Sequence, residues 1–480
     1  MKENVLLNYL NTLAKIIFPL ITFPYAAHIL LPEGIGLVNF QNSIINYISL
    51  ACSIGIPLYA VREIARTREN INERNKNAIE IALLAIFLTI FGYLAVFIIG
   101  QLVPSIHANL KLFYILSLYI FFTAIGVEWF YTAIENFKYI TIRGLLVKSI
   151  LLIPLFLFVK TKNDILIYGL ITVSFSVGNN ILNFIHLRKF ITFSSIQWNK
   201  LNIFRHIKPA FHVFILNIAT SIYTVLNPVL LGFISNNREV GYFTAGIKLS
   251  NIIMIVVTSM ATVLLPRVSN LVQTNQRKQF NELITKVYHY YMALAFPFTA
   301  GLLVLCAPLT LLICGKAFYP ACYTTALTAP TVIFISITNI IGIQILYPYG
   351  KEDMVTLSTI VGAIANLILG LLLIPSYGAV GAAISTTSAE LSVLIIQVKL
   401  GAKYIPFNLI DKNILVYITA ALIMSIAVFA TKLLFSNLIL QIVASTLVGI
   451  ITYAAFLYYK KEDILFMIIN YINSKIKKQE

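Results

Sequence analysis

Charged side chains are scarce in this sequence. Of its 480 residues, 11% are Asp, Glu, Lys or Arg, and 18 acidic residues stand against 35 basic ones. A water-facing surface needs about a quarter of its residues charged, so an ordinary soluble protein is excluded. Cysteine is rare too, with four in the chain, which excludes a disulfide framework. Whether Cys314 and Cys322, which flank one outer turn, form a single disulfide stays open.

Motifs of enzymes and metal sites are also absent. The sequence has no glycine-rich nucleotide-binding loop, no His-Glu-x-x-His and no nucleophile elbow. His28, His186 and His212 have no metal-ligand spacing between them. We therefore expect no enzymatic activity, no metal and no cofactor.

Long apolar runs are what the chain has in abundance. Apolar residues make up 59% of it, and the mean hydropathy is +0.87. About 20 apolar residues cross the hydrocarbon core of a bilayer as a helix. The sequence predicts an all-α polytopic membrane protein. Its fourteen transmembrane helices are expected at residues 10–31, 36–61, 78–99, 111–131, 142–159, 164–187, 209–233, 240–263, 288–313, 325–347, 355–373, 378–398, 414–434 and 438–459.

The chain repeats its own plan. A hairpin of two apolar runs at residues 10–61 recurs at 209–263, and Gly36 and Gly241 lie 205 positions apart, as do Arg62 and Arg267. We therefore predict two pseudo-symmetric lobes of six helices each. The predicted parts are an N-terminal lobe at 1–187, a cytoplasmic linker at 188–208, a C-terminal lobe at 209–400, and two extra helices with a basic cytoplasmic tail at 401–480.

Lys and Arg fix the expected orientation. Most of the 35 basic residues fall in alternate loops, and positive loops stay in the cytoplasm. This pattern places both termini in the cytoplasm, with the first apolar run retained as a helix rather than cleaved as a signal peptide. The net charge of +17 is then a topological signal, because the loops face an anionic leaflet. Binding of nucleic acid is not expected.

Basic residues at membrane depth are the first candidates for a site. A charge at the centre of a membrane helix costs roughly 2.5–3.5 kcal/mol, so each one calls for a functional hypothesis. Lys248, Lys148, Lys15 and Arg143 would line a cationic cavity that neutralises an anionic head group. The alternative is structural: the lysines pair with Glu390 or Glu128, cap unwound backbone, or, for Lys15, reach the interface.

Acids at membrane depth are fewer. Glu390 lies near mid-membrane, and Glu128 lies near the cytoplasmic end of its predicted helix. Both are candidates for coupling transport to a cation or proton gradient. A buried ion pair, or a protonated carboxyl that donates to a backbone carbonyl, is the competing interpretation of Glu390.

Prolines interrupt matching helices of the two halves. Pro19 and Pro24 lie in the first predicted helix, Pro57 near the end of the second, and Pro228 in the seventh. Paired kinks are expected where two halves rock about a central site, so these prolines are candidate hinges. The alternative is that proline is simply common in membrane helices.

Several motifs, in order, resemble the bacterial polysaccharide flippases of O-antigen type. They are FPLITFPY at 18–25, GIG at 34–36, GIPLY at 55–59, REIA at 62–65, EWF at 128–130, ENFKYI at 135–140, Arg143, FVKTK at 158–162 and GAVGAA at 378–383. The resemblance covers nearly the whole chain. It implies the MATE-like fold of the multidrug/oligosaccharidyl-lipid/polysaccharide exporter superfamily.

The resemblance also implies a task. Its substrate would be an undecaprenyl-diphosphate-linked oligosaccharide, turned by alternating access from the cytoplasmic to the outer leaflet of the bacterial inner membrane. A polysaccharide polymerase is a candidate partner. The alternative is a drug or cation antiporter of the same fold, which would concentrate acids in its cavity. A membrane polymerase or acyltransferase comes third, because the outer loops are too short to hold a substrate.

Overall fold

The computed structural model describes residues 2–191, 198–258, 261–462 and 466, and for 2–13, 15–16, 200, 212–213, 215–224 and 261–263 it describes the backbone alone. Across these residues the chain is helical and has no strand. Eleven helices of the described chain are long and apolar enough to cross a membrane. The prediction of an all-α polytopic fold is therefore confirmed, while the exact number of fourteen spans remains a prediction.

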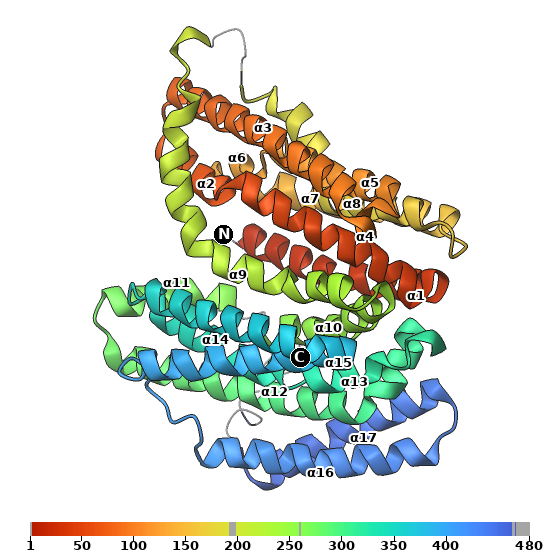
Figure 1. Cartoon of the computed structure of the whole chain (residues 1–480). Helices are drawn as coiled ribbons and strands as arrows, with labels where there is room; N and C mark the ends of the chain where they lie inside the picture. Colours follow the sequence, from red (N-terminus) through yellow and green to blue (C-terminus); the bar gives the residue numbers. More distant parts are fainter. Residues whose placement is uncertain (1, 192–197, 259–260, 463–465, 467–480) are drawn as a thin grey trace, which may run out of the picture. The chain divides into compact units, whose positions relative to one another are not determined.

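The chain forms two compact units, Met1–Gly241 and Tyr242–Glu480. The first unit begins with the helical segment Lys2–Ser53 and ends shortly after the helix Ile207–Ile234, which follows the linker (Figure 1). Its elements are α1 (Lys2–Ser53), α2 (Ile56–Arg66), α3 (Ile71–Leu102), α4 (Pro104–His107), α5 (Leu110–Ala124), α6 (Glu128–Ala133), α7 (Phe137–Phe158), α8 (Ile165–Leu187), η2 (Trp198–Lys200), η3 (Ile203–His206) and α9 (Ile207–Ile234).

A break at Leu31 divides α1. Leu31 has φ 60° and ψ 174°, and Pro32 follows it. The residue before a proline is pushed out of the helical region, so this is where the chain can turn. Figure 1 shows the chain reversing its direction between the two parts of α1. The break lies at the boundary expected between the first two predicted helices.

Two predicted spans of the first unit are interrupted near their C-terminal ends. The span predicted at 36–61 breaks at Gly55, whose φ is +71°. A Cβ there would lie 2.6 Å from the Ala210 carbonyl oxygen, so the close approach of α9 requires glycine. The span predicted at 111–131 ends at Ala124, and after Val127 at φ 37° the short helix α6 begins. Apolar composition revealed neither break, but the one at Gly55 lies beside the predicted hinge Pro57.

Helix α10 (Asn237–Thr258) begins at the boundary and continues into the second unit. The remaining elements are α11 (Ala261–Gln273), α12 (Arg277–Cys314), η4 (Lys316–Phe318), α13 (Ala321–Thr328), α14 (Thr331–Asn339), the π-helix η5 (Ile340–Leu346), α15 (Glu352–Gly401), α16 (Lys412–Leu434) and α17 (Leu438–Tyr459). A break at Gly378, with φ 51°, divides α15 as Leu31 divides α1. In Figure 1, α16 and α17 lie side by side.

The second unit differs from the prediction at two places. The cytoplasmic loop expected before residue 288 is mostly helical, because α11 extends to Gln273 and α12 starts at Arg277. The span expected at 325–347 is divided at Pro330, which lacks the N–H that a continuous helix needs, and it finishes in η5. The four cysteines, all among the described residues, are free thiols, so Cys314 and Cys322 form no disulfide.

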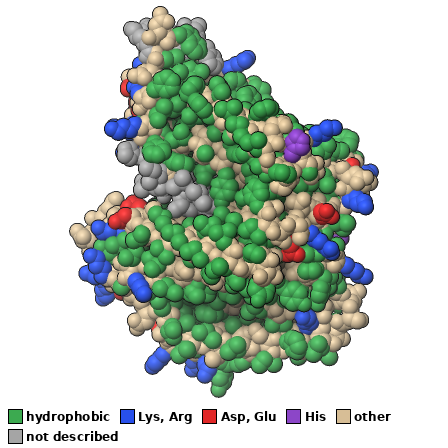
Figure 2. Space-filling model, viewed as in Figure 1, with side chains coloured by type: hydrophobic (Ala, Val, Ile, Leu, Met, Phe, Trp, Pro, Cys, Tyr) green, Lys and Arg blue, Asp and Glu red, His purple; other side chains and the backbone are tan. Residues whose placement is uncertain are grey.

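The outward faces of the helices are apolar. Figure 2 shows hydrophobic side chains over much of the visible surface, with Lys and Arg mostly toward its left and right margins. Leu102 and Leu434 expose 74% and 78% of their surface. A soluble protein avoids apolar patches of this extent, whereas lipid solvates them. The molecule is a multi-pass membrane protein.

Candidate functional site

The structure divides the predicted head-group residues between its two units. Arg143 and Lys148 lie on α7 in the first unit, and Lys248 lies on α10 in the second. Lys15 belongs to α1, but its side chain lies outside the described residues. Arg143 is buried, while Lys148 and Lys248 are partly buried.

Lys248 and Glu390 are both deep within helices of the second unit. Lys248 lies about 16 Å along α10 from Asn237, and Glu390 lies about 18 Å along α15 from the break at Gly378. Glu390 exposes 9% of its surface. Both side chains interact with other groups of the protein, as buried charges must.

Arg143, one of the predicted head-group residues, lies in a cluster of polar and aromatic side chains. One of its terminal nitrogens lies 3.4 Å from the carboxylate of Glu128, which is itself more than half exposed. Its guanidinium carbon lies 5.1 Å from the centre of the Tyr139 ring. The Tyr139 ring stacks on His186 with ring centres 4.1 Å apart, and the Tyr131 ring centre lies 5.0 Å from that of Tyr139 and 5.7 Å from that of His186. Glu128, predicted to couple an ion, is thus the ion-pair partner of Arg143.

Several polar atoms of this cluster have no hydrogen-bond partner among the described residues. Nε and one terminal nitrogen of Arg143 are buried without an acceptor. Oδ1 of Asn179, Oδ1 of Asn183 and Nδ1 of His186, all on the neighbouring helix α8, are buried without a hydrogen-bond partner among the described residues. An unmade hydrogen bond of a buried group costs about 1–3 kcal/mol, and more for a charged one. A polar partner would therefore stabilise each of these atoms.

The predicted hinge prolines differ in the conformation of the backbone around them. Pro19 and Pro24 lie within α1 where the backbone stays helical, and the break occurs at Leu31 instead. Pro57 is the second residue of α2, which begins at Ile56 after the left-handed Gly55, so it lies beside a real interruption. Pro228 lies inside α9.

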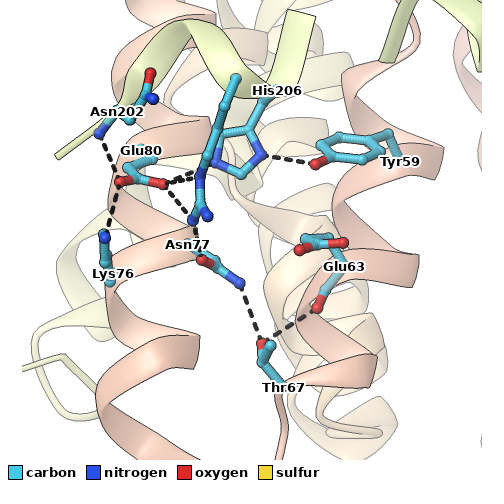
Figure 3. A network of polar contacts seen from close by, with 9 residues as sticks. Tyr59, Glu63, Thr67, Lys76, Asn77, Glu80, Asn202 and His206 are labelled. Carbon is cyan, nitrogen blue, oxygen red and sulfur yellow. Dashed lines mark hydrogen bonds and ion pairs between the residues drawn. The ribbon is translucent and has the colours of Figure 1, made fainter. Parts of the chain in front are cut away.

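A polar network that sequence reasoning missed holds the end of the linker against α3 within the first unit (Figure 3). Its centre is Glu80 on α3, which is completely buried. The Asn202 backbone N–H donates to one carboxylate oxygen at 2.7 Å, and Arg205 Nε donates to the other at 2.8 Å. Lys76 lies 3.8 Å away, and Arg205 also donates to Asn77. We call this network the linker clamp.

His206 completes the linker clamp. Its Nε2 lies 2.9 Å from Glu80 and its Nδ1 lies 2.7 Å from the Tyr59 hydroxyl. A neutral ring satisfies both bonds, with Nε2–H donating to Glu80 and Nδ1 accepting from Tyr59. Burial lowers the pKa of His206 below its ordinary value, although the bond to Glu80 partly opposes this effect. Because α9 begins directly after His206, the linker clamp fixes where α9 starts.

The sequence did contain a signal for the linker clamp. Asn77 and Glu80 are three positions apart, so they share one face of α3 at the start of an otherwise apolar run. The predicted helix began at 78, which placed Asn77 in a loop and left Glu80 unremarked. The saturated hydrogen bonding of Glu80 indicates a structural acid rather than an ion carrier.

An apolar groove lies within the second unit. Its volume is about 380 Å³, and it lies among α10, α12, α16 and α17. Its walls include Ile253, Phe298, Leu302, Met424, Gly449 and Tyr453. Such a lining solvates a hydrocarbon chain and offers almost no polar partner. Within the described residues, no group of three or more His, Cys, Asp or Glu could hold a metal ion.

Comparison with known proteins agrees with this architecture. A family model described as polysaccharide biosynthesis protein matches residues 1–272, which is more than half of the chain. Over 401 residues the chain is 28% identical to the putative O-antigen transporter of Shigella dysenteriae, covering 83% of this chain and 99% of that protein. That relative is named as a transporter, and the expectation that the chain is not an enzyme is confirmed.

Two solved structures share the fold. The lipid II flippase MurJ, in its inward closed conformation, superposes with a TM-score of 0.71 at 18% identity, covering 96% of this chain and 100% of that one. An inward-facing multidrug resistance MATE transporter superposes with a TM-score of 0.62 at 12% identity, covering 83% and 98%. The chain therefore belongs to the polysaccharide biosynthesis protein family and has the MATE-like fold that its sequence motifs predicted.

Proposed function

We propose that this protein is a flippase for an undecaprenyl-diphosphate-linked oligosaccharide. It would turn the lipid from the cytoplasmic to the outer leaflet of the bacterial inner membrane, for the synthesis of a surface polysaccharide. The observation that carries this proposal is the match to the family of polysaccharide biosynthesis proteins, together with an O-antigen transporter that aligns over 99% of its own length.

The chemistry of such a lipid fits the two kinds of surface described above. A diphosphate cannot enter hydrocarbon without groups that replace its hydration. Arg143 has buried donors without acceptors among the described residues, and an arginine can hold two phosphate oxygens at once. The apolar groove of the second unit, at about 380 Å³, suits part of a polyprenyl tail. Transport of this kind needs no chemical change of the substrate.

The remaining parts of the proposal follow from the predicted repeat. Two lobes of six helices, at 1–187 and 209–400, would alternate in access around a head-group site. The linker 188–208 would join them, and the segment 401–480 would add two helices. Fourteen spans and cytoplasmic termini belong to this proposal.

Individual residues have roles within it. Lys248, Lys148, Lys15 and Arg143 would hold the head group, and Glu390 and Glu128 would couple transport to an ion. Pro19, Pro24, Pro57 and Pro228 would act as hinges. A polysaccharide polymerase would receive the product on the outer side.

A drug or cation antiporter is the second candidate, because the fold is shared with a multidrug transporter. The deeply placed acid Glu390 favours it, while the buried guanidinium of Arg143 opposes it, since a cationic drug would be repelled.

Native mass spectrometry of the purified protein tests the proposal. We expect the protein to retain a polyprenyl-diphosphate oligosaccharide in preference to the free polyprenol of the same length. A lipophilic cation should not displace it. Retention of the cation together with no retention of the diphosphate lipid would reject the flippase in favour of the antiporter.

A further inference from the structure

The second unit contains a second cavity. Its lining is polar, in contrast to that of the apolar groove. Its volume is about 530 Å³, within the range of about 300–1,000 Å³ typical of small-molecule sites. Three separate parts of the chain build it: the turn between α11 and α12, the segment after η5, and the segment after α15. We call it the end pocket.

The turn between α11 and α12 forms one wall with a defined backbone. Asn275 has φ 56°, and the Gln276 N–H donates to the Leu271 carbonyl at 2.9 Å. This hydrogen bond closes the turn after α11, and α12 begins directly after the turn at Arg277. Asn275 and Arg277 both line the pocket. The wall is therefore built by regular turn geometry.

The charges of the lining residues have one sign. Arg277 and Lys403 line the pocket and no acid does. Neither cation forms a salt bridge with a described residue, whereas Arg143, Arg205 and Arg68 elsewhere in the chain do. A concave surface with two cations and no acid favours an anion, because its walls concentrate the positive field.

Aromatic rings form a second feature of the lining. Tyr349 packs on the buried Phe280, with ring centres 5.5 Å apart, and Tyr404 packs on Tyr349 at 5.1 Å. Nζ of Lys403 lies 4.9 Å from the centre of the Tyr404 ring. The faces of such rings carry negative charge density and attract the slightly positive C–H edges of a sugar. The amides of Asn275 and Asn281 also line the pocket and suit sugar hydroxyls.

We propose that the end pocket binds a glycosyl phosphate, with Arg277 and Lys403 on the phosphate and Tyr404 against the sugar ring. The same chemistry occurs in a soluble sugar phosphate and in the first sugar of a lipid-linked oligosaccharide. The pocket touches α12 at Arg277, about 24 Å along that helix from Ala293 in the apolar groove. It is thus a site separate from the groove. Its assignment to a lipid-linked ligand rests on the proposed function, but binding of the soluble ligand does not.

Equilibrium binding to the full chain in nanodiscs tests this proposal. The soluble probes are glucose 1-phosphate, inorganic phosphate and glucose, and a second arm uses nanodiscs that contain a polyprenyl-diphosphate-linked sugar. The double variant Arg277→Gln/Lys403→Gln removes both lining cations. The matched control Lys278→Gln/Lys286→Gln removes two exposed cations of α12 that do not line the pocket.

We expect glucose 1-phosphate to bind more tightly than phosphate or glucose. The lining variant should weaken this binding at least tenfold, and the control should change it less than twofold. Tyr404→Leu should reduce the preference for glucose 1-phosphate over phosphate. If the soluble probe fails while the lipid-linked sugar binds through the two cations, the ligand comes from the membrane.

Three results would overturn the proposal: no binding in either arm, equal losses in the lining variant and in the control, or phosphate binding as tightly as glucose 1-phosphate. Translocation by the wild-type protein is measured in parallel. Translocation without binding at the end pocket would reject this site but not the proposed flippase function. Binding at the end pocket without translocation would reject the flippase function but not the site.

Discussion

Arg143 is buried away from water, and neighbouring groups of the protein balance its charge only in part. Glu128 approaches one of its nitrogens at 3.4 Å, and the Tyr139 ring covers the guanidinium. The remaining donors, Nε and one terminal nitrogen, have no acceptor among the described residues. A phosphate oxygen would supply the missing acceptor.

Arg143→Gln should therefore weaken binding of a diphosphate head group by about 10- to 100-fold, because a hydrogen bond to a charged group contributes about 1.5–3 kcal/mol. Glu128→Gln should leave binding unchanged or tighten it, since it removes a competitor for the same guanidinium. Titration of the purified variants with the lipid measures both. Equal weakening by the two substitutions would mean that the ion pair is structural.

His206 gives the linker clamp a dependence on pH. Burial lowers its pKa below the ordinary value of 6.5. Between the lowered value and 6.5, the unfolded chain binds a proton that the folded chain does not, so stability rises with pH across this window. The contribution is complete above 6.5 and is lost as the pH falls.

We expect the Tm of the purified protein to fall more steeply between about pH 7 and pH 5 than that of His206→Gln, which cannot titrate there. Thermal unfolding scans at matched ionic strength measure the difference. Parallel pH profiles of the two proteins would show that His206 does not contribute.

At this scale the sequence predicted which residues are unusual but not their partners. Its position at the start of the span predicted at 142–159 made Arg143 a candidate, and the structure adds two contacts: Tyr139, one turn earlier on α7, and His186 on α8. Glu80 was missed because its partners Asn202 and Arg205 come from a segment that no periodicity describes.

Helix boundaries depend on close approaches of backbone that apolar composition does not record. Gly36 and Gly241 occupy matching positions of the repeat, and each one touches the start of the other's segment. A Cβ on Gly36 would lie 1.6 Å from the Asn237 carbonyl oxygen, and one on Gly241 would lie 2.0 Å from the Pro32 carbonyl oxygen. The repeat thus places both glycines where no side chain fits.

Gly36→Ala and Gly241→Ala should each lower the Tm by several degrees, because a methyl group forced into a packed contact costs about 1–3 kcal/mol. Gly301→Ala is the control: a Cβ there meets nothing within 4 Å, and alanine favours the helix. Size-exclusion thermostability assays compare the three variants. A Tm for Gly36→Ala as high as that for Gly301→Ala would contradict the contact.

At the scale of elements, the apolar runs located most spans but not the breaks within them. Val127 and Pro330 interrupt spans predicted as continuous, whereas the break at Gly55 lies beside the predicted hinge Pro57. Hydropathy averages over a run, whereas a break is set by one residue and its neighbour in space. The basic segment before residue 288 was predicted as a loop because its charges favour the cytoplasm, yet helix α12 begins at Arg277.

The second unit holds two charges of opposite sign deep along its helices, Lys248 on α10 and Glu390 on α15. Under the proposed function, Glu390 couples transport to a cation gradient. Glu390→Gln should then abolish the dependence of transport on the gradient while transport down the substrate gradient persists. Proteoliposomes with and without an imposed proton or sodium gradient measure this. Gradient dependence identical to that of the wild type would assign the carboxylate to structure.

The central claim is tested most directly by translocation in sealed liposomes. A fluorescent polyprenyl-diphosphate oligosaccharide is placed on one leaflet, its arrival on the other is followed, and a cationic dye is present in the same vesicles. We predict protein-dependent translocation of the lipid that the dye does not reduce, with a marked loss in a stably folded Lys248→Ala. A lipid that stays in its leaflet, while the dye moves against an ion gradient, would contradict the flippase and identify an antiporter.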